Sequence, residues 1–155
     1  MSDRLLGRVA LLMMVSAASM WGADPMVGTW VLNAKKSVYK PGPAPKSQTR
    51  VYRENKDGII ATVVTVGVDG KATTVEYPQN YDGLTHPVAG SPDMDAIKMV
   101  QVTTQRSEST ILHAGRPMAT TVRMVSGDGK TLTITFNSTA ENGDPIRNTQ
   151  VYDRK

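Results

Sequence analysis

Hydrophobic and polar residues alternate along most of this chain, in short segments rich in Val, Ile and Thr. The clearest alternation spans residues 131–136. There Leu132, Ile134 and Phe136 share one face, and three threonines share the other. A period of two residues is typical of a strand with one buried face, and these residue types favour strands. The pattern therefore predicts a protein made of β-strands.

Turn signals separate these segments. Asp-Gly or Asn-Gly pairs stand at 57–58, 69–70, 82–83, 128–129 and 142–143. Glycine adopts the positive φ of a tight hairpin turn without a steric penalty, so such pairs favour hairpins. The predicted strands are 27–33, 48–54, 59–66, 72–77, 96–104, 109–114, 118–126, 131–139 and 147–153. No stretch shows a sustained helical period.

Strands joined by short connections lie beside each other and run antiparallel. A long meander closes on itself or splits into two sheets, because an open twisted sheet leaves its edges unpaired. We expect an all-β fold, an antiparallel up-and-down β-barrel of about 8–10 strands, with a β-sandwich as the alternative. The chain has no cysteine, so its stability rests on hydrogen-bond closure and core burial.

Residues 1–23 have the layout of a secretory signal peptide. Arg4 and Arg8 form a basic head, residues 9–15 an apolar run, and residues 16–19 a group of small side chains. The apolar run is too short to cross a bilayer of about 30 Å. We expect cleavage to leave residues 24–155 as a single domain with no stable membrane span, exported to a periplasm or to the cell exterior.

Composition narrows the set of partners. The chain has a formal net charge of +4, and no basic block is longer than the pair Lys35-Lys36. Proteins that bind nucleic acids show a basic stripe with stacking aromatic side chains, so no nucleic-acid partner is expected. No cofactor is expected either, and we expect a monomer.

The two ends of the domain carry its most specific motifs. The first strand opens with Gly-Thr-Trp-x-Leu-Asn, followed by Lys-Ser and Pro-Gly-Pro-Ala-Pro, and the last strand reads Asn-Thr-Gln-Val-Tyr-Asp-Arg. This layout resembles the calycin barrels, the superfamily of lipocalins and fatty-acid-binding proteins. Within it, the chain is most similar to exported bacterial lipocalin-like proteins. The resemblance implies a lipocalin-like barrel.

The resemblance also implies roles for residues at the barrel floor. Gly28 allows close approach of the backbone where the first and last strands meet, and Trp30 plugs the floor. In lipocalins, an arginine of the last strand covers this tryptophan. Here Arg154 or Arg147 is available for such a cation–π contact.

In fatty-acid-binding proteins, an Arg-x-Tyr pair on the last strand holds the carboxylate of the ligand. The matching positions here are Gln150 and Tyr152. A glutamine can hydrogen-bond an alcohol, aldehyde or amide, but it cannot neutralise a carboxylate. The resemblance therefore implies a ligand with a neutral polar end, held by Gln150 and Tyr152.

The same proteins carry a helix-turn-helix lid between their first two strands, and residues 34–47 do not fit one. Pro41, Pro43 and Pro45 fall within this stretch, and proline cannot continue a helix. We interpret the stretch as a semi-rigid extended loop across one end of the barrel. The stretch either simply connects the two strands across the barrel end or controls access to the mouth of the barrel.

Strand phase indicates which side chains point into the barrel. Val122 and Met124 share a phase, so we expect both inside and Arg123 outside. The expected cavity lining is Val75, Tyr77, Met99, Ile111, Met124, Ile134 and Phe136. The hydroxyl groups of Tyr52 and Tyr77, together with Gln150, would supply convergent polar groups for a small ligand. The same side chains would also suit a solid, filled barrel, and both possibilities stay open.

The sequence gives little support for catalysis. It has no cysteine and no Gly-x-Ser-x-Gly elbow, and its two histidines are His86 and His113. A barrel enzyme would need His113 or Glu76 beside a tyrosine in the cavity. A metal site would need carboxylates such as Asp93 near the histidines, and none is expected.

Three functions follow from these observations. The first is an exported binder of a small lipophilic ligand with a neutral polar end. The second is a filled-barrel structural or interaction module of the cell envelope. The third, which the sequence supports least, is a barrel enzyme.

Overall fold

The computed structural model describes residues 22–155, so almost all of the predicted signal peptide lies outside the described residues. The described part forms strands and no helix. The strands are β1 (Gly28–Leu32), β2 (Val38–Lys40), β3 (Ser47–Asn55), β4 (Gly58–Val66), β5 (Ala72–Pro78), β6 (Asp82–Pro87), β7 (Ala96–Thr103), β8 (Arg106–His113), β9 (Arg116–Val125), β10 (Thr131–Thr139) and β11 (Pro145–Arg154).

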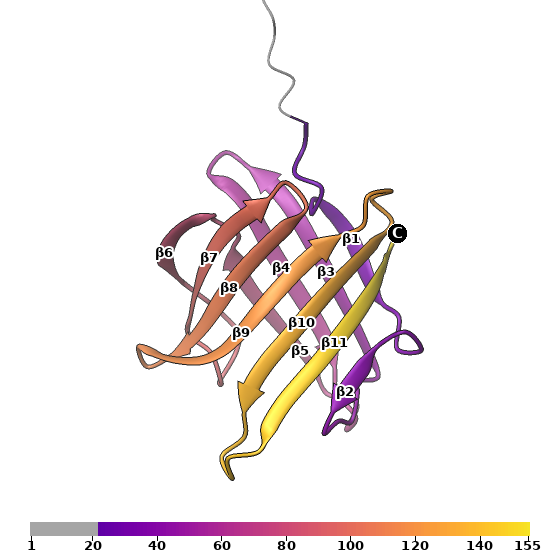
Figure 1. The fold of residues 1–155 in the computed structure, drawn as a ribbon, viewed down its shortest axis with the longest axis vertical. Helices are drawn as coiled ribbons and strands as arrows, with labels where there is room; N and C mark the ends of the chain where they lie inside the picture. Colours follow the sequence, from indigo (N-terminus) through magenta and orange to yellow (C-terminus); the bar gives the residue numbers. More distant parts are fainter. Residues whose placement is uncertain (1–21) are drawn as a thin grey trace, which may run out of the picture.

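The strands form one antiparallel sheet that curls into a nearly closed barrel (Figure 1). Its order is β5-β4-β3-β1-β11-β10-β9-β8-β7-β6, and β2 pairs with β11 beside this path. The all-β antiparallel barrel expected from the alternation is therefore confirmed, and the β-sandwich alternative is wrong.

The barrel closes between β5 and the loop that follows β6. There Glu76 and Ala89 form a single antiparallel bridge. The N–H of Glu76 donates to the Ala89 carbonyl at 3.0 Å, and the N–H of Ala89 donates to the Glu76 carbonyl at 2.9 Å. This seam is the weakest part of the ring.

Two short strands, β2 and β6, were not predicted from the sequence. β2 lies within the stretch expected to be an extended loop, where Tyr39 pairs with Asn148 of β11. It is only three residues long and borders on prolines, so no alternation marks it. β6 begins at the Asp82-Gly83 pair, which we interpreted as a turn. Its register against β7 is irregular between Asp82 and Thr85, where the glycine falls.

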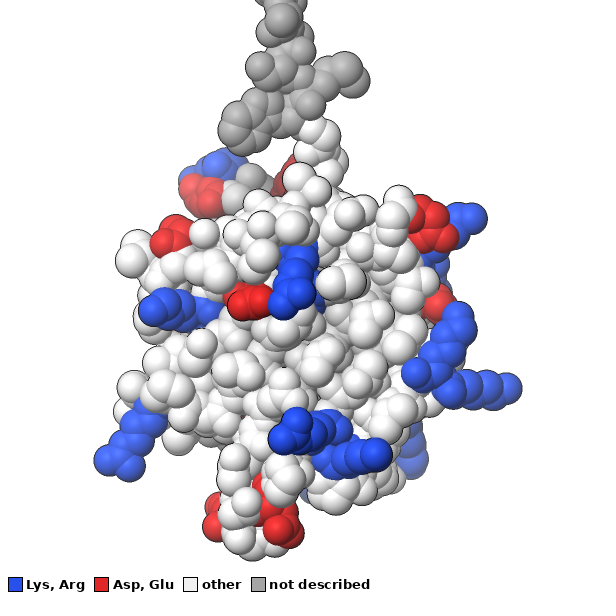
Figure 2. Space-filling model, viewed as in Figure 1, with Lys and Arg blue, Asp and Glu red and all other residues white. Residues whose placement is uncertain are grey.

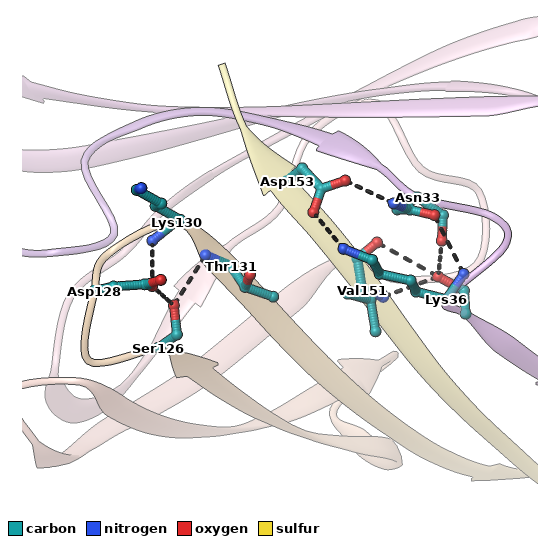
Figure 3. A network of polar contacts seen from close by, with 9 residues as sticks. Asn33, Lys36, Ser126, Asp128, Lys130, Thr131, Val151 and Asp153 are labelled. Carbon is teal, nitrogen blue, oxygen red and sulfur yellow. Dashed lines mark hydrogen bonds and ion pairs between the residues drawn. The ribbon is translucent and has the colours of Figure 1, made fainter.

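The turn between β1 and β2 is fixed to β11 by side chains (Figure 3). The amide of Asn33 donates to a carboxylate oxygen of Asp153 at 2.6 Å, and the Lys36 ammonium donates to the other at 3.3 Å. The Ser37 hydroxyl donates to the Asn33 carbonyl at 2.8 Å and accepts from the Val151 N–H at 2.9 Å. These contacts set the path of the chain toward β2.

Trp30 closes one end of the barrel, and its side chain is fully buried. Its indole N–H donates to the Met26 carbonyl at 2.8 Å. The guanidinium carbon of Arg154 lies 4.1 Å from the centre of the Trp30 ring. The same guanidinium donates at 2.5–2.7 Å to three backbone carbonyls, those of Pro25, Val27 and Gly129. Arg154 thus joins three chain segments over the tryptophan.

Gly28 is required by this arrangement. Its φ is +139°, which disfavours any residue with a side chain. A Cβ atom at this position would lie 2.4 Å from a terminal nitrogen of Arg154. The glycine therefore makes room for the guanidinium rather than for a neighbouring strand.

Neither the basic nor the acidic side chains form a large patch on the face shown in Figure 2. Lysines and arginines are spread over that face, with acidic residues between them. Among residues 22–155, no helix is long and apolar enough to cross a membrane.

Candidate ligand-binding site

A cavity of about 270 Å³ lies inside the barrel, away from the end that Trp30 closes. Its apolar lining comes from six strands: Val63, Val75, Ile97, Ile111, Ala119, Ile134 and Phe136. Ser91, Asp93 and Met94 of the β6–β7 loop stand at its mouth, together with Met118 at the start of β9. The barrel is therefore plugged at one end and hollow toward the other.

Arg123 points into this cavity and is only 2% exposed. One terminal nitrogen donates to the hydroxyl groups of Ser109 and Thr121, both at 2.9 Å. The other donates to the Tyr77 hydroxyl at 3.3 Å. Its Nε is buried and has no partner among the described residues.

The predicted orientation of β9 was wrong. Met124 is 46% exposed on the outer wall and cannot contact a ligand in the cavity. Ala119, Thr121, Arg123 and Val125 form the inner face instead. The hydroxyl groups of Ser109 and Thr121 accept hydrogen bonds from the guanidinium inside the barrel, and with Arg123 pointing inward its neighbour Met124 points to solvent.

Arg50 lines the same cavity from β3. Its guanidinium carbon lies 5.2 Å from the centre of the Tyr152 ring, and its buried Nε has no partner among the described residues. Burial alone would lower the pKa of Arg50, but the nearby hydroxyl groups of Tyr152, Tyr52 and Tyr77 outweigh it and raise the pKa above its usual value. Arg50 therefore stays charged inside the barrel.

Two tyrosines lie between these cations. Burial raises the pKa of Tyr77, but the charges of Arg123 and Arg50 and the hydrogen bond from Arg123 outweigh it and hold the pKa below its ordinary value. Burial and Tyr77 raise the pKa of Tyr52, whose hydroxyl has no hydrogen-bond partner. The two arginines therefore favour negative charge at Tyr77.

No buried carboxylate balances the two arginines within the described residues. Asp93 is the one carboxylate that lines the cavity, and it is an exposed residue at the mouth. It forms no ion pair in the described part of the chain. The interior thus holds two guanidinium charges and unpaired polar atoms on Arg50, Arg123 and Tyr52.

The residues expected to hold a neutral head group form a separate cluster. Gln150 lines the cavity. The hydroxyl of Tyr152 lies between side-chain oxygens of Gln48 and Gln150, and the Gln150 contact is 2.9 Å. The Gln48 amide donates onward to Thr65 at 2.7 Å. Tyr152 is fully buried and orients the two glutamines rather than lining the cavity itself.

The predicted site residues thus separate into three groups. Tyr77, Phe136 and Gln150 line the cavity, while Tyr52 and Tyr152 are buried in the wall around it. Met124 lies outside. Arg123 was expected outside the barrel, and Arg50 was not predicted as a site residue although it shares its strand phase with Tyr52.

The two groups that a barrel enzyme would need, His113 and Glu76, do not line the cavity. The side chain of His113 is 54% exposed and lies 3.9 Å from Asp95 at the rim. Glu76 accepts a hydrogen bond from Thr62 on the outer wall at 3.3 Å. The described residues contain no group of three or more side chains that could hold a metal ion.

Comparisons with known proteins give a match only at the level of structure. No protein-family profile and no curated protein matches the chain. The crystal structure of zebrafish ileal bile acid-binding protein complexed with cholic acid superposes with a TM-score of 0.53 and 12% identity, over 84% of this chain and 99% of that one. The chain has a calycin-type fold. At this identity the likeness concerns the fold alone, and the similarity to exported bacterial lipocalin-like proteins stays a prediction.

Proposed function

We propose that this protein binds one small lipophilic molecule, with the apolar body of the ligand in the cavity and a negatively charged end beside Arg123 and Arg50. The observation that carries the proposal is the presence of both guanidinium groups in an otherwise largely apolar cavity without a buried carboxylate. A ligand anion would supply the missing counter-charge.

The energetics favour such a ligand. A buried charge without a partner destabilises a protein by several kcal/mol, and the free energy recovered on pairing it becomes available for binding. Arginine suits this role because its planar group can donate two parallel hydrogen bonds to a carboxylate or sulfonate. Tyr77 and Tyr52 would add hydroxyl donors to the same oxygens.

Cavity size limits the ligand. A volume of about 270 Å³ is slightly below the range of roughly 300–1,000 Å³ that is usual for ligand pockets. It suits a small aromatic acid or a medium-length fatty acid. Cholic acid in the crystal of the similarly folded zebrafish protein supports an acidic lipophile by analogy of fold.

A neutral ligand is the second candidate, and Gln150 is the observation that favours it. Its amide lines the cavity beside Gln48, and Tyr152 holds both glutamines in place. In this case the arginines would hold Tyr77 and Tyr152 in the cavity wall. The head group of the ligand would hydrogen-bond the side-chain amides of Gln48 and Gln150.

Two fluorescent probes with the same aromatic skeleton separate these candidates. Anilinonaphthalene sulfonate carries one anionic group, and phenylnaphthylamine lacks it. The proposal predicts that the wild-type protein binds the sulfonate more tightly, and that Arg123→Met removes this preference by weakening the sulfonate about tenfold or more. Equal binding of the two probes, weakened for both by Gln150→Ala, would establish the neutral ligand instead. Binding of neither probe would favour the filled structural barrel.

Export belongs to the same proposal and rests on the layout of residues 1–23. Expression of the full chain in a bacterium should yield a shortened protein in the periplasmic or external fraction. Intact mass measurement would give the cleavage position. A full-length protein in the cytosol would contradict this part of the proposal.

A further inference from the structure

The seam between β5 and the loop after β6 differs from the other contacts in the barrel wall. Each other pair of neighbouring strands shares at least three paired residues in its ladder. At the seam, Glu76 and Ala89 form one bridge. Opening the wall there breaks the two backbone hydrogen bonds of that bridge, so the cost of local opening is lowest at this point.

The loop of residues 88–95 contains Ala89 of this bridge, and three of its side chains line the mouth of the cavity. Asp95 holds its far end: the backbone N–H donates to the Leu112 carbonyl at 3.1 Å, and the carboxylate accepts from the Ala114 N–H at 2.7 Å. Between these ends, the hydrogen bond found for residues 90–94 is internal to the loop, from the Asp93 N–H to the Ser91 hydroxyl at 3.2 Å.

At Gly90 the backbone of the loop packs closely against the backbone of β5. Its φ is +84°, and a Cβ atom there would lie 2.0 Å from the Thr74 carbonyl oxygen. Ser91, Asp93 and Met94, which follow directly, line the cavity. The position of the loop over the mouth therefore depends on close backbone contact with β5.

The opposite end of the barrel offers no route. Trp30 is fully buried there, and Arg154 joins the chain segments above it through three carbonyl contacts. A ligand that reaches Arg123 has to pass the mouth, where the loop stands.

We propose that residues 88–95 form a door to the cavity, which opens when the Glu76–Ala89 bridge breaks and swings on the contacts of Asp95. This inference rests on the proposed function, because a door matters only if a ligand enters.

A disulfide lock tests the door, and the absence of native cysteine makes the test clean. Residues in a hydrogen-bonded antiparallel pair have Cα atoms about 5.5 Å apart, within reach of a disulfide. In the Glu76→Cys/Ala89→Cys variant, oxidation should slow association and release of anilinonaphthalene sulfonate by about tenfold or more, and reduction should restore both rates. The control is Met124→Cys/Thr133→Cys, a paired position on the outer wall, where oxidation should leave the rates unchanged.

A second variant keeps the proposal testable if the lock does not form. Gly90→Ala should push the loop off β5 and accelerate both association and release. Gly143→Ala is the matched control, because its φ of +89° gives similar backbone strain in another turn, while no atom lies within 4 Å of its Cβ position. It should leave the rates unchanged.

The outcomes separate the two proposals. If the wild-type protein binds the probe and the oxidised lock exchanges it at the unlocked rate, or Gly90→Ala behaves as its control, the door is wrong and the proposed function stands. If the wild-type protein takes up no probe, the proposed function fails, and the door that rests on it falls as well.

Discussion

The guanidinium of Arg154 lies over the Trp30 ring, with its central carbon 4.1 Å from the ring centre. Lysine at this position would keep the charge but lose the planar group that reaches three carbonyls. We expect Arg154→Lys to lower the free energy of unfolding by about 2 to 4 kcal/mol, since each hydrogen bond from a charged group contributes roughly 1.5 to 3 kcal/mol. Urea denaturation of residues 24–155, monitored by Trp30 fluorescence, measures this change in the free energy of unfolding. A loss below about 0.5 kcal/mol would show that Arg154 does not hold this end together.

Gly28→Ala should destabilise the same end by a different route. A Cβ atom would displace the Arg154 guanidinium and require an unfavourable φ of +139°. The expected loss is about 1 to 3 kcal/mol. Gly127→Ala is the control. No atom lies within 4 Å of a Cβ atom built there, and its φ lies outside the left-handed region that favours glycine. The two variants should differ clearly in thermal denaturation, and equal behaviour would contradict the packing described for Gly28.

Arg123→Met should affect the ligand-free protein and the complex in opposite ways. Without ligand, the variant removes a buried charge that lacks a carboxylate, and Ser109 and Thr121 keep their mutual hydrogen bond of 2.7 Å. Replacing such a charge by an apolar side chain is often neutral or stabilising by about 1 to 4 kcal/mol. We therefore expect unchanged or higher stability in urea, together with loss of the stabilisation that anilinonaphthalene sulfonate gives the wild type. Strong destabilisation of the ligand-free variant would show that Arg123 is structural.

Tyr39 should make the protein less stable at alkaline pH. Burial, and then Tyr152, raise its pKa from 10.0 to about 12 in the folded state. The unfolded chain ionises this tyrosine first, so its contribution is fully present below pH 10 and is lost as the pH rises toward about 12. Urea denaturation across this interval should show a steeper fall for wild type than for Tyr39→Phe. Parallel curves would mean that the hydroxyl is solvated.

Asp93 should slow the approach of anions. It is the one carboxylate among the residues that line the cavity, and it stands at the mouth. Asp93→Asn should raise the association rate of anilinonaphthalene sulfonate a few-fold at low salt, with less effect at high salt, and leave phenylnaphthylamine unchanged. Stopped-flow fluorescence measures both. A similar change for both probes would point to altered loop packing instead of charge.

The strands with simple alternation could be predicted from the sequence, and β10 shows why. Leu132 and Ile134 are buried, and the threonines that alternate with them are only partly buried. On β9 the same reasoning failed at Arg123 and Met124, because a polar interior reverses the usual assignment of faces. A single strand does not reveal that Ser109, across the ladder, supplies a partner for a buried arginine.

The candidate site was predicted only in part for a related reason. Gln150 and Tyr77 were found from strand phase and from a matching motif, and both line the cavity. Arg50 comes from a strand four places away from β9 in the sheet order. Arg50 and Arg123 line the same cavity because the barrel closes, and local sequence patterns do not encode barrel closure.

The N–H of Lys155 donates to the Thr29 carbonyl at 2.9 Å, which places the last residue beside β1 at the plugged end of the barrel. Gly22, the first described residue, lies at that end as well, because it lines one surface hollow together with Pro25, whose carbonyl accepts a hydrogen bond from Arg154. A tether attached at either position would therefore hold the molecule by its plug. Immobilised on a sensor surface in this way, every copy would present its mouth to the solution, and the rate measurements above could be made without steric interference from the support.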